Sequence, residues 1–323
     1  MGRWSVYALL LVVAACQALL HADEAPAVDS SKSVLRLGFS SSMFAGVNEN
    51  DAKAAMKIWA QAILLEHNVA VIAESQVLNG NDEIASAVRN KLLDAVSLTT
   101  EEYRALGGEW MSTNAIIGVN EGLITQEYLV LVHADSQMDR IEDLKGHSLV
   151  FFQNPTASLA PVWLDTQLLK SGLGQTRQVC VRVTQGAKLS QVVLPVFFRQ
   201  IDACVVTRRG FKTMVELNPQ VGQRLKILGT SPPLVPVVFV FRADYSGTVR
   251  DRILTDIDKV HTTVASQQVL TLFQCENLAV HSVSCLAPAL ELLANHARLC
   301  GLTSQVGLNR SNGPISNAKG GGL

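Results

Sequence analysis

Residues 94–103 read Asp-Ala-Val-Ser-Leu-Thr-Thr-Glu-Glu-Tyr, and this stretch decides the fold class. Its apolar run at 95–98 is typical of a buried strand, and residues 100–106 have the pattern of a short helix. Thr99 stands where this helix would begin, and Glu102 follows it at the spacing of a capping box. A strand that passes directly into a helix indicates an α/β unit.

The same alternation extends outward from this stretch in both directions. Short apolar runs predict strands at 35–39, 69–73, 115–119, 128–133, 148–152, 179–183, 203–206, 225–228 and 235–241. Amphipathic spacing predicts helices at 51–66, 81–93, 159–170, 189–198, 208–217, 249–260, 263–273 and 287–299, with Pro195 disturbing one of them. Residues 301–323 are rich in Gly, Ser and Asn and are expected to form a disordered tail. This order of elements favours the α/β class with mostly parallel sheets.

Composition excludes two classes of protein. The chain has 323 residues, of which 48% are hydrophobic, and this is enough to build a sizeable core rather than a disordered chain. Its 27 Lys and Arg balance 28 Asp and Glu, whereas binding to the nucleic-acid backbone requires clustered excess basic residues. We therefore expect no nucleic-acid partner.

The first 22 residues are predicted to be a signal peptide. Arg3 precedes an apolar run at 4–15 that is too short to span a membrane and has the length of a signal h-region. Cleavage after Ala22 is one processing route. The other is lipidation at Cys16, because Val-Ala-Ala-Cys resembles a lipobox. Residues 23–33 then form a linker, and contact with the membrane is expected only through such a lipid anchor.

The sequence carries no recognisable enzyme signature. It lacks G-x-S-x-G, H-E-x-x-H, Walker and dinucleotide-binding motifs, and its seven His are scattered singly. We expect no catalytic residues, no metal site and no cofactor. Five cysteines follow residue 22. Cys180 and Cys204 lie in apolar runs typical of a core, and one disulfide is expected among Cys275, Cys285 and Cys300.

Polar side chains, most of them hydroxyls, follow three of the predicted strands and are the candidate ligand-binding residues. The candidates are Ser40 and Ser41 after the first strand, Thr99 and Thr100 after the strand at 95–98, and Asn154, Thr156 and Ser158 after the strand at 148–152. At the carboxyl ends of parallel strands, such junctions offer hydroxyls and free backbone N–H groups that can hold an anion. Each hydroxyl taken alone is better explained as an N-cap, and it is the three junctions together that favour a shared anion site.

Three further side chains could complete an anion site. Lys188 and Arg208 could add charge-assisted hydrogen bonds, and Tyr103 could bond to or stack on a ligand. The alternatives are solvated surface charge for the two cations and core packing for the tyrosine.

Several segments together resemble the extracytoplasmic solute-binding proteins of ABC importers, in the phosphate, phosphite and phosphonate branch. The resemblance covers about residues 34–272. It rests on the strand at 35–39, the stretch at 94–103, Ile-Glu-Asp-Leu-Lys-Gly at 141–146, Asn-Pro-Thr-Ala-Ser at 154–158, Asp-Ala-Cys-Val-Val-Thr at 202–207 and Glu-Leu-Asn-Pro-Gln at 216–220. It implies a two-lobed type II periplasmic-binding fold. One lobe would comprise 34–134 plus 237–300 and the other 135–236, joined by strands that cross near 128–133 and 235–241.

The resemblance also implies a function, the capture of a small oxyanion in the periplasm for delivery to an ABC permease and ATPase. The family's phosphonate-holding turn matches Thr156-Ala157-Ser158, and the family's His falls on Lys188. Its acidic–aromatic pair, which recognises a ligand amine, falls on Thr207-Arg208. These departures argue against an aminoalkyl ligand. They also motivate an alternative, a periplasmic sensing module that presents its bound form to a membrane receptor or histidine kinase.

Overall fold

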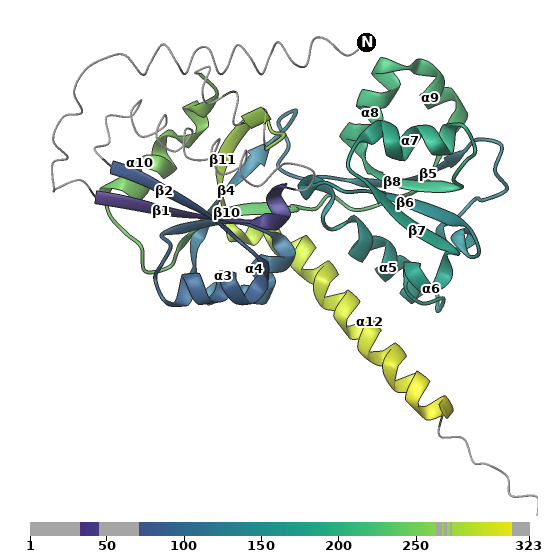
Figure 1. The fold of residues 1–323 in the computed structure, drawn as a ribbon, viewed down its shortest axis with the longest axis horizontal. Helices are drawn as coiled ribbons and strands as arrows, with labels where there is room; N and C mark the ends of the chain where they lie inside the picture. Colours follow the sequence, from purple (N-terminus) through teal and green to yellow (C-terminus); the bar gives the residue numbers. More distant parts are fainter. Residues whose placement is uncertain (1–32, 45–70, 263–266, 268–269, 272, 312–323) are drawn as a thin grey trace, which may run out of the picture. The chain divides into compact units, whose positions relative to one another are not determined.

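β1 (Ser33–Ser40) opens the part of the chain whose structure is known. The computed structural model describes residues 33–44, 71–262, 267, 270–271 and 273–311 (Figure 1). Residues from Val34 onward form one compact unit that contains two sheets. The predicted signal peptide and linker, the helix at 51–66 and much of the helix at 263–273 lie outside the described residues.

The larger sheet and its flanking helices form what we call lobe 1. Its strands in spatial order are β11 (Asn277–Ser282), β4 (Met111–Val119), β10 (Val237–Arg242), β3 (Ala95–Thr99), β1 and β2 (Val71–Leu78). Its helical elements are η2 (Ser41–Phe44), α3 (Gly80–Arg89), α4 (Thr100–Leu106), η3 (Gly108–Trp110), α10 (Thr248–Asp256), η6 (Ile257–Thr262) and η7 (Val283–Leu286). Neighbouring residues of β4 enter different apolar clusters, Ile116 one and Ile117 the other, because side chains alternate between the two faces of a sheet.

The smaller sheet and its helices form lobe 2. Its strands in spatial order are β7 (Arg182–Gly186), β6 (Ser148–Phe152), β8 (Ala203–Thr207), β5 (Tyr128–His133) and β9 (Leu225–Thr230). Its helical elements are η4 (Ile141–Leu144), η5 (Pro155–Ala157), α5 (Ala160–Lys170), α6 (Thr176–Val179), α7 (Leu189–Phe197), α8 (Arg208–Leu217) and α9 (Pro219–Arg224). The run from Tyr128 to Val132 is fully buried, as expected for a strand covered on both faces.

Both sheets are mixed, which corrects the expectation of mostly parallel sheets. β1 pairs in parallel with β3, and β6 pairs in parallel with β7 and β8. β10 instead runs antiparallel to β3 and β4, and β5 runs antiparallel to β8 and β9. These two strands enter directly from the other lobe, without the helical crossover that parallel neighbours require, so they run against their neighbours.

The connections between the lobes differ from those predicted. β5 lies wholly in lobe 2 and β10 wholly in lobe 1, so neither strand crosses. The crossing segments are 120–127 and 231–236, and the boundary expected at residue 134 lies too far along the chain. Gln126 and Leu234 pair these segments through two backbone hydrogen bonds, Gln126 N to Leu234 O at 2.7 Å and the reverse at 2.9 Å.

Three local predictions also need correction. The residues expected as a strand at 179–183 form the end of α6 and the beginning of β7. α12 (Ala287–Ser311) continues past residue 301, where a tail was expected, and it packs against both α4 of lobe 1 and α5 of lobe 2 (Figure 1). Cys275 and Cys285 are free thiols, so the disulfide expected among Cys275, Cys285 and Cys300 does not form.

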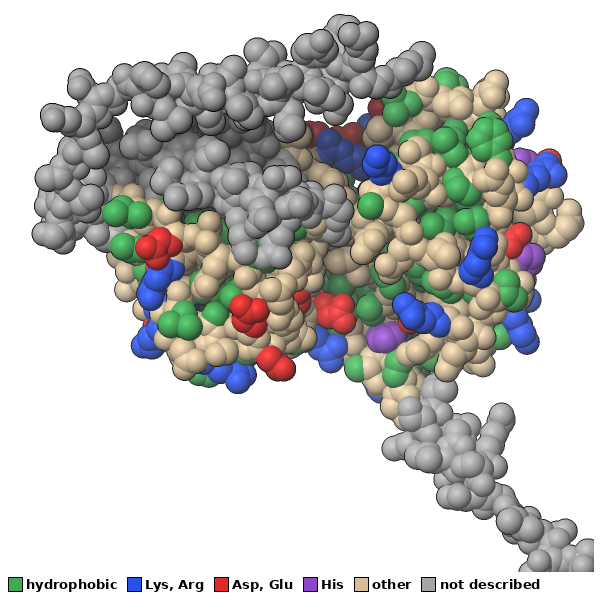
Figure 2. Space-filling view, in the orientation of Figure 1, with side chains coloured by type: hydrophobic (Ala, Val, Ile, Leu, Met, Phe, Trp, Pro, Cys, Tyr) green, Lys and Arg blue, Asp and Glu red, His purple; other side chains and the backbone are tan. Residues whose placement is uncertain are grey.

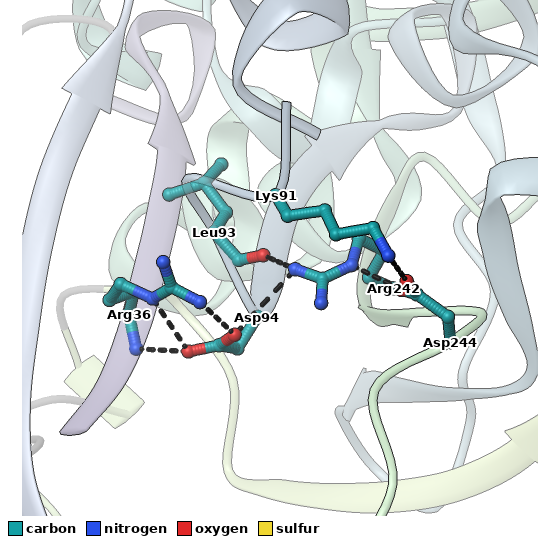
Figure 3. A network of polar contacts seen from close by, with 6 residues as sticks. All are labelled: Arg36, Lys91, Leu93, Asp94, Arg242 and Asp244. Carbon is teal, nitrogen blue, oxygen red and sulfur yellow. Dashed lines mark hydrogen bonds and ion pairs between the residues drawn. The ribbon is translucent and has the colours of Figure 1, made fainter. Parts of the chain in front are cut away.

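A charged network fixes three strands of lobe 1 where β1 and β3 begin and β10 ends (Figure 3). Asp94 is 2% exposed, and its carboxylate accepts hydrogen bonds from the backbone N–H of Arg36 at 2.8 Å and from that guanidinium at 3.1 and 2.8 Å. Arg242 lies 3.6 Å from the same carboxylate and also contacts Asp244, which pairs with Lys91 at 2.7 Å. The buried charge is thus compensated by two guanidinium groups.

Candidate functional site

The hydroxyl groups where β1 and β3 end converge on one carboxylate. Ser40 Oγ and Ser42 Oγ donate to Glu102 Oε1 at 2.5 and 2.8 Å. The backbone N–H and the hydroxyl of Thr99 donate to Glu102 Oε2 at 2.9 and 3.0 Å. Thr99 and Glu102 form the predicted capping box, but the two serines extend it across the sheet. The lobe 1 donors thus already hold an anion, which is the protein's own Glu102.

The other predicted residues of lobe 1 have different surroundings. Thr100 is fully buried, and its hydroxyl donates to the carbonyl of Val235 at 2.6 Å, which ties α4 to the second crossing segment. Tyr103 is 5% exposed and packs in a core cluster, where burial raises the pKa of its hydroxyl. Ser41 is half-buried. Sequence reasoning did not select Glu102 as a site residue, although its capping-box spacing was visible.

In lobe 2, the predicted turn after β6 is held by Asn154. Its Oδ1 accepts from the backbone N–H of Thr156 at 3.0 Å and from that residue's hydroxyl at 2.7 Å. Its Nδ2 donates to Gln274 Oε1 of lobe 1 at 3.0 Å, and Ser158 Oγ donates to the carbonyl of Pro236 at 3.3 Å. Asn154 therefore caps η5 and joins the lobes. η5 lies against η2, so the predicted hydroxyl turns of the two lobes are brought together.

The three predicted residues after β7 and β8 have different surroundings. Lys188 is exposed at the N-cap of α7 and forms no ion pair with the described residues. Thr207 is buried, and its hydroxyl caps α8 by accepting from Gly210 N at 3.0 Å. Arg208 Nε pairs with Glu127 at 2.5 Å. Lys188 thus keeps a charge available for an anion, whereas Thr207 and Arg208 are engaged within the protein.

Two ion pairs connect α8 of lobe 2 with lobe 1 and with the first crossing segment. Arg209 Nη2 lies 2.8 Å from Glu276 Oε1, and Lys212 Nζ lies 2.8 Å from Glu121 Oε1. The hydrogen bond with Lys212 lowers the pKa of Glu121 and raises that of the lysine. Figure 2 shows Lys and Arg at several separate places on the displayed face of lobe 2 rather than in one basic patch.

A cavity of about 120 Å³ lies beside η5 and extends into lobe 1. Its walls are largely apolar and come from β1, β4 and β10, including Leu37, Phe39, Ile116, Val237 and Phe239. Pro155 and Thr156 complete the wall from lobe 2, and Thr156 is the one predicted site residue that lines it. The cavity also borders Ser97, Asn120 and Gln126, so its surface carries a few polar groups.

Among the described residues, no three His, Cys, Asp or Glu side chains are grouped so that they could hold a metal ion. No helix within the described ranges is both long and apolar enough to cross a membrane.

The sequence matches one family model over residues 48–281, and this model is described as ABC transporter, phosphonate, periplasmic substrate-binding protein. No curated protein matches the chain.

Solved structures of several bacterial proteins share the fold. XAC2383 from Xanthomonas citri, bound to chloride, has a TM-score of 0.59 and 17% identity over 84% of this chain and 99% of its own. A phosphonate-transporter binding protein from Pseudomonas aeruginosa, PA3383, has a TM-score of 0.56 and 14% identity over 83% of this chain and 88% of its own. PhnD1 from Prochlorococcus marinus, in complex with methylphosphonate, has a TM-score of 0.53 and 13% identity over 80% of this chain and 97% of its own. At these identities the likeness establishes the two-lobed fold alone.

Proposed function

Because the chain belongs to the family of periplasmic substrate-binding proteins of phosphonate ABC transporters, we propose that it captures a small phosphorus oxyanion between its two lobes for import. The family gives a solute-binding role in the periplasm. The class of solute and the delivery to a permease and ATPase are the proposed part. The family match does not favour the sensing alternative.

The observation that carries the proposal is the cavity whose wall is completed by both lobes. At its lobe 2 end, Thr156 lies in the turn that precedes α5, where helix N–H groups and hydroxyls attract negative charge. Ser158 stands in the same turn, and Lys188 is the exposed cation that we assign to the solute. In this proposal the hydroxyls of Thr156 and Ser158 turn from Asn154 and Pro236 to the oxyanion, which helix N–H groups and one ammonium group also hold.

Capture requires that the lobes separate and close again. The paired segments 120–127 and 231–236 form the proposed hinge, since they are the places where the chain passes between the lobes. The contacts of Asn154 with Gln274 and of Arg209 with Glu276 join the lobes and must break on opening, and the ion pair of Lys212 with Glu121 holds α8 against the hinge. A solute that touches both lobes binds the closed form more tightly and so drives closure.

Calorimetry and thermal unfolding with phosphate, phosphite and methylphosphonate test this function. At a ligand concentration 100-fold above Kd, binding stabilises the protein by about 2.7 kcal/mol. Lys188→Ala should weaken binding by about tenfold or more, since a charge-assisted hydrogen bond contributes roughly 1.5–3 kcal/mol. Lys170→Ala, at the distant end of α5, is the matched control and should bind as the unmodified protein does. Absence of binding to all three anions would refute the proposal.

A further inference from the structure

The charge distribution of lobe 1 disfavours an oxyanion at that end of the site. Glu102 is buried, and the hydroxyls of Ser40, Ser42 and Thr99 already donate to its carboxylate where β1 and β3 end. An anionic group placed there would lie near a like charge, which is unfavourable at low dielectric. The lobe 2 turn at 153–160 contains no carboxylate, although Thr156 and Ser158 also donate within the protein. The charged end of a solute is therefore expected at lobe 2, beside Thr156.

The cavity offers a matching place for the rest of such a solute. From Thr156 it extends along strands β1, β4 and β10, where Phe39, Ile116 and Val237 are among the apolar side chains of its wall. Its volume of about 120 Å³ is close to that of cavities, about 150 Å³, that stay dry and take up benzene. Filling it with an apolar group would remove that group from water at little cost to the protein.

A buried polar atom of the cavity lining also lacks a partner. Asn120 is 8% exposed; its Nδ2 donates to the carbonyl of Gln274 at 3.0 Å, but its Oδ1 accepts no hydrogen bond within the described part of the chain. A buried acceptor without a donor costs about 1–3 kcal/mol. A ligand that carries one neutral N–H or O–H group on its organic part would satisfy this oxygen.

We propose that the solute is an organic phosphorus oxyanion whose uncharged, apolar substituent fills this cavity, with the oxyanion at the Thr156 end. The proposal rests on the proposed function and adds the class of substituent. A phenyl group or a short branched alkyl group fits the volume, and a neutral donor on it would bond to Asn120. An ammonium group is excluded by the cost of burying a charge among apolar side chains.

The test is calorimetry with inorganic phosphate, methylphosphonate, phenylphosphonate and aminoethylphosphonate. Phenylphosphonate should bind roughly tenfold or more tightly than methylphosphonate, because the ring buries several additional carbons. Val237→Phe fills the cavity and should weaken binding of phenylphosphonate more than that of methylphosphonate, which removes this preference. Ile227→Phe adds the same ring at an exposed position of β9 and should leave the preference intact. If Val237→Phe does not fold, Val237→Leu should reduce the preference in the same direction.

Benzene separates failure of this inference from failure of the proposed function. It should bind to the unmodified protein without any oxyanion and should not bind to Val237→Phe. If no phosphorus compound binds but benzene does, the proposed function fails and the cavity remains a site for an apolar group. Equal affinity for methyl- and phenylphosphonate overturns the inference and leaves the function standing. Absence of binding to both benzene and the phosphonates overturns both.

Discussion

The carboxylate of Glu102 should be one of the most important single groups for the stability of lobe 1. In Glu102→Ala, the fully buried hydroxyl of Ser40 and both donors of Thr99, which is 6% exposed, lose their acceptor. The bond from Ser42 is also lost, but that side chain is exposed and can turn to water. The substitution therefore leaves the buried donors without an acceptor but does not change the β-strands that carry them.

The magnitude follows from these contacts. Each buried donor left without a partner costs about 1–3 kcal/mol, whereas the N-cap bond from the backbone N–H of residue 102 to Thr99 Oγ1 survives the substitution. Allowing for rotation of the two hydroxyls toward other acceptors, we expect Glu102→Ala to lower the free energy of unfolding by about 3 kcal/mol. Glu102→Gln keeps one acceptor oxygen, so its free energy of unfolding should lie between those of the unmodified protein and Glu102→Ala.

Urea unfolding followed by circular dichroism measures this loss, with Glu101→Ala as the matched control. Glu101 lies in the same first turn of α4 and carries the same charge, but it is exposed and its side chain makes no hydrogen bond among the described residues. Its removal should cost no more than the dipole interaction of about 0.3–1 kcal/mol. Equal losses in the two alanine variants would refute the reasoning, because the effect would then come from charge in the first turn rather than from the buried donors.

Three further outcomes are expected. Asp94→Asn should lower the free energy of unfolding by about 3 kcal/mol in urea titrations, because two guanidinium groups lose a buried counter-charge; a loss below about 1 kcal/mol would contradict this. Hydrogen bonds from its cationic neighbours, that of Lys91 first, lower the pKa of Asp244 from 3.8 to about 2. The contribution of Asp244 to stability is therefore complete above pH 3.8 and is lost as the pH falls toward 2. In Asp244→Asn, the free energy of unfolding should depend less steeply on pH between these values. A pH dependence equal to that of the unmodified protein would contradict this prediction. Removing Arg209 and Lys212 together by alanine substitution should weaken solute binding about fivefold at low salt and less at high salt, as calorimetry can show. Arg140→Ala, whose ion pair lies within lobe 2, should not have this effect.

The parts of the fold that depend on neighbouring residues were predictable from the sequence. The strand β3, its Thr99 cap and α4 were predicted because the capping box acts over three residues. β7 was misplaced because it is an edge strand with mostly exposed side chains, so its sequence carries little hydrophobic pattern. The antiparallel direction of β5 and β10 depends on the path of the chain between lobes, which no local pattern records.

The residue types of the candidate site were predictable, but the partners to which their side chains point were not. The sequence indicated hydroxyls where the strands end, but whether a hydroxyl faces a ligand or the protein depends on distant partners. Ser40 bonds to a residue 62 positions away, and Thr100 to one 135 positions away. Thr207 caps its own helix, the alternative that a sequence cannot separate from ligand binding. The cavity is assembled from strands far apart in the chain, so it had no signal in the sequence.

The pairing of Gln126 with Leu234 has a consequence for how this chain can be rebuilt. The chain enters and leaves lobe 2 through two segments joined by backbone hydrogen bonds of 2.7 and 2.9 Å. Lobe 2 is thus an insertion whose two ends are neighbours, the arrangement in which domain insertion is tolerated. A relative's second lobe could be grafted between these two positions without altering the path of lobe 1. The part of the specificity that comes from lobe 2 would then be exchangeable as a cassette, with the face of α5 that packs on α12 as the surface to be matched.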